Sequence, residues 1–371
     1  MCNKNKESNR IDFLDISKGI GITLVVMGHL IGEGSKSFSG SDFFQGWIYS
    51  FHMPLFFIIS GILLGFSLSK DAPNKYKKKA TSLLNNLLLP YFLWTAVYFV
   101  LDSRSLNSYS YLNEWLICTL SFRGRAPIWF AGALFWAEII ALLIVQFLEK
   151  NGYCNRCIAI KEKFPIRNCE TKKRHFIQQK CLLLITVATF SLSAITWFFY
   201  NHNAPKSYII DCFEVSVFRG ILCLGFVLVG LLLHKTSVLN SDIKKAFPTF
   251  VTMMAASLFF CYQFDSGSNL HTFSIGNIFL FIASGVTGSI AVLELSKLAC
   301  MRFNLKVLKV IGKNTLGIMC LHYIHLPFMQ YATEICTFFK MTGLVAFLFS
   351  LVFVISCSLA GSFVLKRRLL L

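Results

Sequence analysis

The sequence predicts an all-α protein, a polytopic membrane bundle of about ten helices with both termini on the cytoplasmic side. Three observations carry this prediction. Hydrophobic residues make up 55% of the 371 residues and charged residues only 15%, which is too little charge for a soluble protein of this length. The apolar residues gather in blocks of about 20, the length that crosses a bilayer core as a helix. The basic residues lie mostly between alternate blocks, as the positive-inside rule requires.

The ten predicted spans form one integral membrane domain that occupies the whole chain, residues 1–371. A helix satisfies its own backbone hydrogen bonds in lipid, so each apolar block is expected to be helical. The predicted spans cover residues 16–33, 44–66, 83–101, 127–148, 181–200, 214–233, 247–264, 275–296, 314–332 and 342–365.

The formal net charge of +18 is explained by topology. With the N-terminus in the cytoplasm, 29 of the 36 Lys and Arg residues fall on the inner side, six fall in outer loops, and Arg219 lies within a span. Nucleic acid is therefore not expected as a partner, whereas membrane lipids are.

Two loops differ in composition from the other connecting segments. The longest inner loop, 149–180, is strongly basic and suits an anionic membrane surface. It contains Cys154, Cys157, Cys169 and His175, which could bind zinc, but their spacing favours free cytosolic thiols and no metal is expected. The outer segment 102–126 contains WLICTLSF, which is too short to span and predicts an interfacial or re-entrant helix.

The first span carries an ion pair and a histidine on one face. Eleven positions separate Lys18 from His29, so the two lie on the same side of the helix, about 16 Å apart along its axis. Asp15 lies one turn before Lys18 and can pair with it. An ionisable residue inside a span is a candidate functional residue. The alternative is a cytoplasmic anchor with one hydrogen-bonded core histidine.

Further histidines lie in the second and ninth predicted spans. His52 lies about one turn inside the outer surface and can face a cavity shared with His29, where imidazoles suit proton transfer near neutral pH. The alternative role is a hydrogen bond at the interface. His322 and His325 share one helix side but lack a convincing third ligand for a metal. Lys313 lies at the inner start of that helix, where a phosphate can bind.

Five sequence blocks occur in the order found in a known family. They are RIDFLDISKGIG, which leads into Lys18, ten residues and His29, followed by MPLFFIISGILLG, LLLPYFLW, IWFAGALFWAEI and IGKNTLGIMCLH. Together they resemble the acyltransferase-3 family of integral membrane acyltransferases, which includes carbohydrate O-acetyltransferases, over nearly the whole chain. Many members carry an Arg-rich element before the third span, where this chain has Lys77, Lys78 and Lys79 followed by Asn85 and Asn86.

The resemblance implies an enzyme of the plasma (inner) membrane. Members move an acyl group, commonly acetyl, from cytosolic acyl-CoA to a hydroxyl of an extracytoplasmic glycan or lipid-linked sugar. The essential histidine of the family maps to His29, expected as general base or as acyl carrier, and its basic partner maps to Lys18. His322, His52 and Arg125 are candidate oxyanion donors.

The remaining site residues follow from this expected reaction. The donor phosphates are expected at Lys18, held by Asp15, and at Lys77, Lys78, Lys79 and Lys313. The acceptor is expected near Arg123, Arg125 and Trp47. A proton-coupled transporter or flippase for a glycan-related substrate is the main alternative, with the buried ionisable residues as a proton relay. The lack of an internal repeat counts against it. If the protein were a non-catalytic scaffold, the ionisable residues Lys18 and His29 on one helix face would have no function.

Overall fold

The computed structural model of the protein describes residues 2–32, 40–69, 72–101, 109–151, 167–202, 207–235, 243–263, 268–322 and 327–369. Within these ranges the regular elements are helices, and the one β-type contact is an isolated bridge between Asn269 and Ser274. Nine of the described helical segments are long and apolar enough to cross a membrane. The predicted all-α membrane bundle is confirmed.

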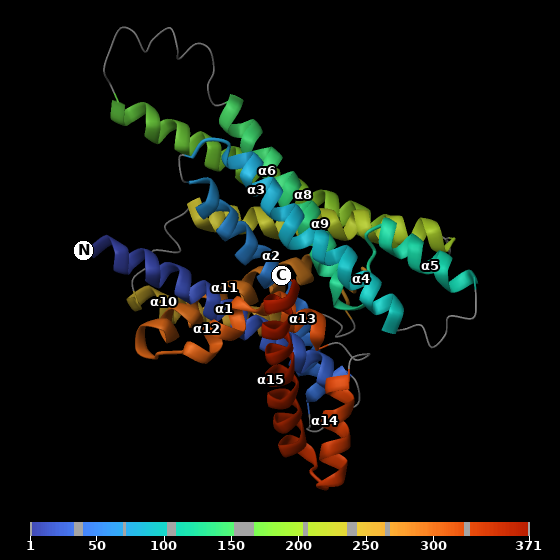
Figure 1. Cartoon of the computed structure of the whole chain (residues 1–371). Coiled ribbons are helices and arrows are strands. Elements are labelled where there is room, and N and C mark those ends of the chain that lie inside the picture. The colour runs from blue at the N-terminus through green and yellow to red at the C-terminus, as the bar shows by residue number, and fades with distance from the viewer. Residues whose placement is uncertain are drawn as a thin grey trace.

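Most of the predicted spans lie within described helices, although the helices that contain the first and fifth spans begin 14 residues earlier than predicted. Figure 1 shows how the helices are arranged. They are α1 (Cys2–Gly32), α2 (Ser41–Leu68), α3 (Lys75–Leu83), a π-helical turn (Leu84–Leu88), α4 (Leu89–Leu101), α5 (Tyr109–Leu120), a 3-10 turn (Ala126–Ile128), α6 (Trp129–Asn151), α8 (Arg167–His202), α9 (Tyr208–Lys235), α10 (Ile243–Tyr262), α11 (Ile278–Arg302), α12 (Lys306–Lys313), α13 (Thr315–Leu321), α14 (Pro327–Phe338) and α15 (Gly343–Leu369). The first six residues of WLICTLSF, the stretch judged too short to span, lie in the short helix α5, and the last two form the turn that follows it.

The region predicted as the ninth span, 314–332, is not one long helix. The backbone leaves the helical region at Asn314, whose side-chain amide donates to the Val310 carbonyl at 2.7 Å, so α12 and α13 are separate helices. Helix α14 begins at Pro327, a residue that suits a first helical position because its missing N–H has no partner there. An apolar block of sufficient length did not reveal these breaks.

Helix α2 is the centre of the bundle and packs against α1, α9 and α11. Of the candidate spans it is the most buried, at 78% of its apolar window. Its crossing with α9 is a backbone contact, because a side chain at Gly61 would strike the Val227 carbonyl and one at Gly230 would strike the Ile58 carbonyl. Small residues at both positions let these helices approach closely within a membrane.

The inner half of α1 crosses α12 in the same way. A side chain at Gly19 would meet the Leu308 carbonyl, and one at Gly312 would meet the Asp15 carbonyl. Lys309 of α12 donates to Asp12 of α1 at 2.6 Å. The charged start of the first span is therefore fixed against the chain segment that leads into α13. Helices α14 and α15 lie side by side and extend away from the other helices (Figure 1).

Candidate active site

His29 borders a cavity of about 340 Å³ among α1, α2 and the loops that charge distribution places outside the membrane. We call it the outer cavity. It is lined by Val25, His29, Gly32, Tyr49, His52, Met53, Pro127, Trp129, Ser268, Asn269, Leu270, His271 and Met319. The expectation that His29 and His52 face a common cavity therefore agrees with the geometry. A volume of this size is in the range of small-ligand sites.

Two rings contact the imidazole of His29. The centroid of His322 lies 5.2 Å away and that of Tyr49 lies 6.2 Å away, both tilted relative to the His29 ring. Gly28 makes room for Tyr49, since a side chain at position 28 would collide with the tyrosine ring. Within the described residues no hydrogen bond engages the His29 ring nitrogens, so its lone pair is available to a ligand.

The proton positions of His52 and His322 follow from their hydrogen bonds. His52 Nδ1–H donates to the Ile48 carbonyl at 2.7 Å, and His322 Nδ1–H donates to the Ile318 carbonyl at 3.0 Å, because a carbonyl can only accept. Each Nε2 is then unprotonated in the neutral ring. For His322 this atom is buried without a hydrogen-bond partner among the described residues. Neither neutral ring has a proton for an oxyanion, which does not fit their expected role as donors.

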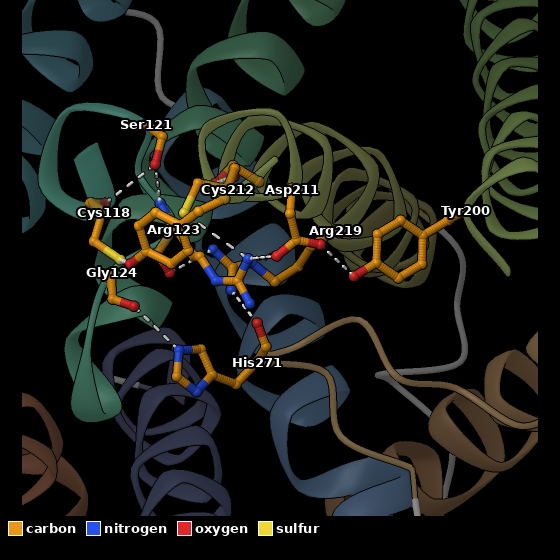
Figure 2. A network of polar contacts seen from close by, with 11 residues as sticks. Cys118, Ser121, Arg123, Gly124, Tyr200, Asp211, Cys212, Arg219 and His271 are labelled. Carbon is orange, nitrogen blue, oxygen red and sulfur yellow. Dashed lines mark hydrogen bonds and ion pairs between the residues drawn. The ribbon is translucent and has the colours of Figure 1, made fainter. Parts of the chain in front are cut away.

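Arg219 holds together the loops above the outer cavity (Figure 2). Its side chain is only 1% exposed, and it donates to the carbonyls of His271 at 2.6 Å and of Phe122 and Arg123 at 2.9 Å each. The guanidinium also lies 4.7 Å from the ring centroid of Trp129. One buried cation thus joins segment 121–125 to the loop at 268–276, with peptide dipoles and an aromatic face around its charge.

His271 is the third histidine of the outer cavity. Its Nε2–H donates to the Gly124 carbonyl at 3.1 Å, and its ring stacks on Trp129 with centroids 5.8 Å apart and planes 10° apart. Gly124 has a φ of +65°, which a glycine adopts without strain, and a side chain there would strike Trp129. Burial, and then the positive charge of Arg219, lower the pKa of His271 from 6.5 to about 4. The ring is therefore neutral near pH 7.

A smaller cavity of about 140 Å³ lies nearer the inner end of α1. We call it the inner cavity. It is lined by Lys18, Phe56, Ile59, Ser60, Leu63, Leu87, Phe130, Leu134, Thr315, Leu316 and Met319. Lys18 pairs with Asp15 at 2.7 Å, as predicted from their spacing, and Lys313 lies 4.0 Å from the same carboxylate. Lys18 and Lys313 are therefore brought together, although they are distant in sequence.

The three lysines before the third span have different surroundings. Lys77 and Lys78 are exposed and can meet a phosphate. Lys79 points into the bundle, where its Nζ lies 2.9 Å from a carboxylate oxygen of the buried Glu138. Glu138 also accepts from the Ser60 hydroxyl. Because Lys79 already has a buried partner, its geometry fits a structural ion pair better than the expected donor contact.

The predicted acceptor residues do not form one group. Arg123 pairs with Asp211, which also accepts from the Tyr200 hydroxyl at 2.9 Å (Figure 2). Arg125 lies 3.6 Å from Glu114 and stacks over the Tyr111 ring at 5.1 Å.

Trp47 lies on α2, and its Nε1–H donates to the Ser257 hydroxyl at 3.1 Å. None of the three predicted acceptor residues lines the outer cavity.

Metal ligation has little support in the described part of the chain, where no group of three or more His, Cys, Asp or Glu residues could hold a metal ion. The possible zinc ligands Cys154 and Cys157 lie outside the described residues, as do the side chains of Cys169 and His175. His325 also lies outside them.

Several residues of the two cavities were missed by sequence reasoning. Tyr49 precedes His52 by three positions, so helical spacing could have placed it on the same side of α2. Trp129 follows Pro127 at the start of a span and looks like an ordinary interface aromatic. His271 lies in a loop, where periodicity gives no direction. Met319 lies on an apolar helix, and nothing in its sequence context separates it from its neighbours.

Comparison with known proteins identifies the family of the chain. The sequence profile of a family described as "Acyltransferase domain" matches residues 11–367. The chain is 35% identical over 146 residues to a protein named Nodulation protein NolL from Mesorhizobium japonicum, and 29% identical over 167 residues to a protein of the same name from Sinorhizobium fredii. These alignments cover 38% and 43% of this chain, and they span only 36% and 43% of the two relatives. No solved structure matches.

Proposed function

Because the chain belongs to the acyltransferase domain family, whose profile covers residues 11–367, we propose that it transfers an acyl group across the membrane. The donor is cytosolic acyl-CoA, with acetyl as the favoured group. The acceptor is a hydroxyl of an extracytoplasmic glycan or lipid-linked sugar, and the membrane is the plasma (inner) membrane. Both termini lie in the cytoplasm.

One observation carries this proposal. Helix α1 presents Lys18 to the inner cavity and His29 to the outer cavity, and the two residues lie about 16 Å apart along the helix. A cation on the inner side suits the phosphates of a cytosolic donor. On the outer side, His29 suits proton transfer from an acceptor hydroxyl, because its ring has no hydrogen bond to the described residues.

The reaction balances with His29 as general base. The acceptor hydroxyl oxygen attacks the thioester carbonyl carbon while its proton passes to the His29 imidazole. The tetrahedral intermediate then breaks its carbon–sulfur bond, and the coenzyme A sulfur takes the proton from the imidazolium. The products are an acyl ester and the free coenzyme A thiol. An acyl-histidine intermediate would divide the same overall transfer into two steps.

The outer cavity offers other donors for the developing oxyanion. His52 and His322 each give their ring proton to a backbone carbonyl, so we assign this role to other residues of the cavity. The Tyr49 hydroxyl and the Trp129 indole N–H belong to residues that line the cavity. Tyr49 also contacts the His29 ring, which makes it the first choice.

The donor phosphates are assigned to the basic inner face. Lys18 and Lys313 share Asp15, so a phosphate could replace or join that carboxylate between them. The exposed Lys77 and Lys78 extend the same positive surface. Lysine binds phosphate as a point charge, which suits a flexible, partly exposed site.

The decisive test uses membranes that contain the protein and labelled acetyl-CoA. We expect label to enter a glycan fraction with the wild-type chain, and we expect His29→Ala to abolish it without changing the amount of inserted protein. His202→Ala is the matched control, because His202 is an exposed histidine at the end of α8. Transfer at the wild-type rate by His29→Ala would reject the proposal.

A transporter or flippase is the second candidate, because one cavity near each end of α1 also suits alternating access. Transport would move a substrate without consuming acyl-CoA. Release of coenzyme A thiol in the same membranes therefore separates the two functions, since the transferase produces it in proportion to the labelled glycan.

A further inference from the structure

The inner and outer cavities have one lining residue in common. Among the described residues, only Met319 of α13 borders both the 340 Å³ outer cavity and the 140 Å³ inner cavity. Its side chain is 3% exposed and belongs to the main hydrophobic core. At this point both cavities therefore border the same residue.

On two neighbouring helices, residues close in sequence line different cavities. On α2, Met53 lines the outer cavity and Phe56, one turn further, lines the inner cavity. On α6, the consecutive residues Trp129 and Phe130 line the outer and inner cavities, respectively. The rings of Phe56 and Phe130 meet edge to face at 5.8 Å. On each of these helices the change from the outer to the inner cavity takes at most one turn, and Met319 borders both cavities.

Methionine is suited to a wall that opens. Its unbranched side chain has three rotatable bonds, so it can change shape without displacing the backbone. The helix that carries it is short and ends at Leu321. By contrast, Phe56 and Phe130 are rigid rings that contact each other and belong to the longer helices α2 and α6.

We propose that Met319 is the partition between donor and acceptor, and that its displacement lets the acyl end of the donor reach His29. This inference rests on the proposed function for the identity of the ligands. The inner cavity has mostly apolar walls with Lys18 on its lining, which suits a linear acyl-thioester chain behind anionic phosphates. With the methionine in place, water from the outer side is kept from the thioester.

The first test measures the partition without any enzymatic activity. Ser60 lines the inner cavity only, so Ser60→Cys places a thiol behind the wall. A charged, membrane-impermeant methanethiosulfonate is added on the side of the outer loops, and mass spectrometry reads the modification at position 60. We expect little modification with Met319 present and at least about ten times more with Met319→Ala.

Met53→Ala is the matched control for that test. Met53 is also a buried methionine, at 6% exposure, but it lines the outer cavity alone. Its removal should enlarge the outer cavity and leave position 60 protected. The proposed partition would be overturned if the cysteine at position 60 were modified equally in three proteins: Ser60→Cys alone, and Ser60→Cys combined with Met319→Ala or with Met53→Ala. This outcome does not depend on which reaction the enzyme catalyses.

The second test measures transfer. Met319→Trp fills the passage with a rigid ring, and we expect acyl transfer to fall by about 100-fold, the loss typical of a misplaced reacting group. Binding of labelled coenzyme A at the inner face should stay within a factor of two. Met319→Ala should raise coenzyme A release without acceptor, because water reaches the thioester.

Wild-type transfer by Met319→Trp would overturn the inference while leaving the proposed function intact. No transfer by the wild-type chain would instead remove the proposed function, and the labelling test would still decide whether Met319 separates the cavities.

Discussion

The imidazole rings of His29 and His322 lie with their centroids 5.2 Å apart, although one belongs to the first helix and the other to the end of α13. The Nδ1–H of His322 is fixed on the Ile318 carbonyl, which sets the ring against His29. His322 is therefore expected to be a positioning residue, with a bare Nε2 that can orient or share the proton held by His29.

Replacing His322 by asparagine should distinguish a packing role of this residue from a role in proton transfer. The Asn amide can still donate to the Ile318 carbonyl, but it lacks the ring Nε2. We expect kcat to fall by about 100-fold with both KM values little changed, which is the range for loss of assisted proton transfer. Steady-state kinetics in proteoliposomes measures both. A kcat within twofold of wild type would limit His322 to packing.

Lys18→Ala should weaken donor use. Lys18 lines the inner cavity beside Asp15, so its loss removes a cation from the expected phosphate site. We expect the donor KM to rise by about tenfold, equivalent to about 1.4 kcal/mol, and the effect to shrink at high salt. Lys340→Ala, on the predicted outer side, is the control and should change nothing. An unchanged donor KM in Lys18→Ala would mean that Lys18 serves only to hold Asp15.

Glu138→Gln should destabilise the bundle more than it affects the reaction directly. It leaves Lys79 next to a neutral side chain in a mostly buried position. Breaking one side of a buried ion pair costs about 3 kcal/mol. Thermal unfolding in detergent should show the loss, and the double variant Glu138→Gln with Lys79→Met should recover much of it. A double variant as unstable as the single one would show that the pair is not coupled.

Arg219→Lys should disconnect the two outer loops while keeping a positive charge. Lysine lacks the planar fork that reaches three carbonyls at once, and each charge-assisted hydrogen bond contributes roughly 1.5–3 kcal/mol. We expect proteolysis near residues 121–125 to accelerate and transfer to fall by about 100-fold. Arg302→Lys, at the end of α11, is the control. Normal protease resistance and transfer in Arg219→Lys would contradict this role.

Acidification should loosen the same loops through His271. Its pKa is lowered by burial and by Arg219 to about 4 in the folded protein, against 6.5 when unfolded. The folded state therefore binds fewer protons, and stability present above about pH 6.5 is lost as the pH falls toward 4. The loss is on the order of 3 kcal/mol. His271→Gln should flatten this part of the stability–pH curve, whereas an unchanged curve would assign the effect to other groups.

Sequence patterns predicted most of the membrane-spanning helices and the shared face of Lys18 and His29 on α1, because both depend on local repetition. Apolar blocks set the spans, and a period of 3.6 residues placed Lys18 and His29 on one face. The break at Asn314 was missed, since a side-chain bond to the preceding turn does not alter hydropathy.

The remaining features depend on contacts between distant segments. Arg219 binds backbone carbonyls, which every residue has, so no sequence pattern could identify its partners. Lys77, Lys78 and Lys79 form one uniform basic run, yet only Lys79 meets the buried Glu138. The position of His271 over Trp129 likewise follows from two loops folding together.

The hydrogen bonds from Arg219 to both loops have a consequence for any attempt to change the acceptor specificity of the protein. Segment 121–125 and the loop at 268–276 cannot be exchanged independently, because a graft of either one alone would leave the guanidinium short of carbonyls at fixed positions. Chimeras between relatives should therefore work only when both segments and the arginine come from the same parent. We expect the sequences of the two loops to vary together among relatives.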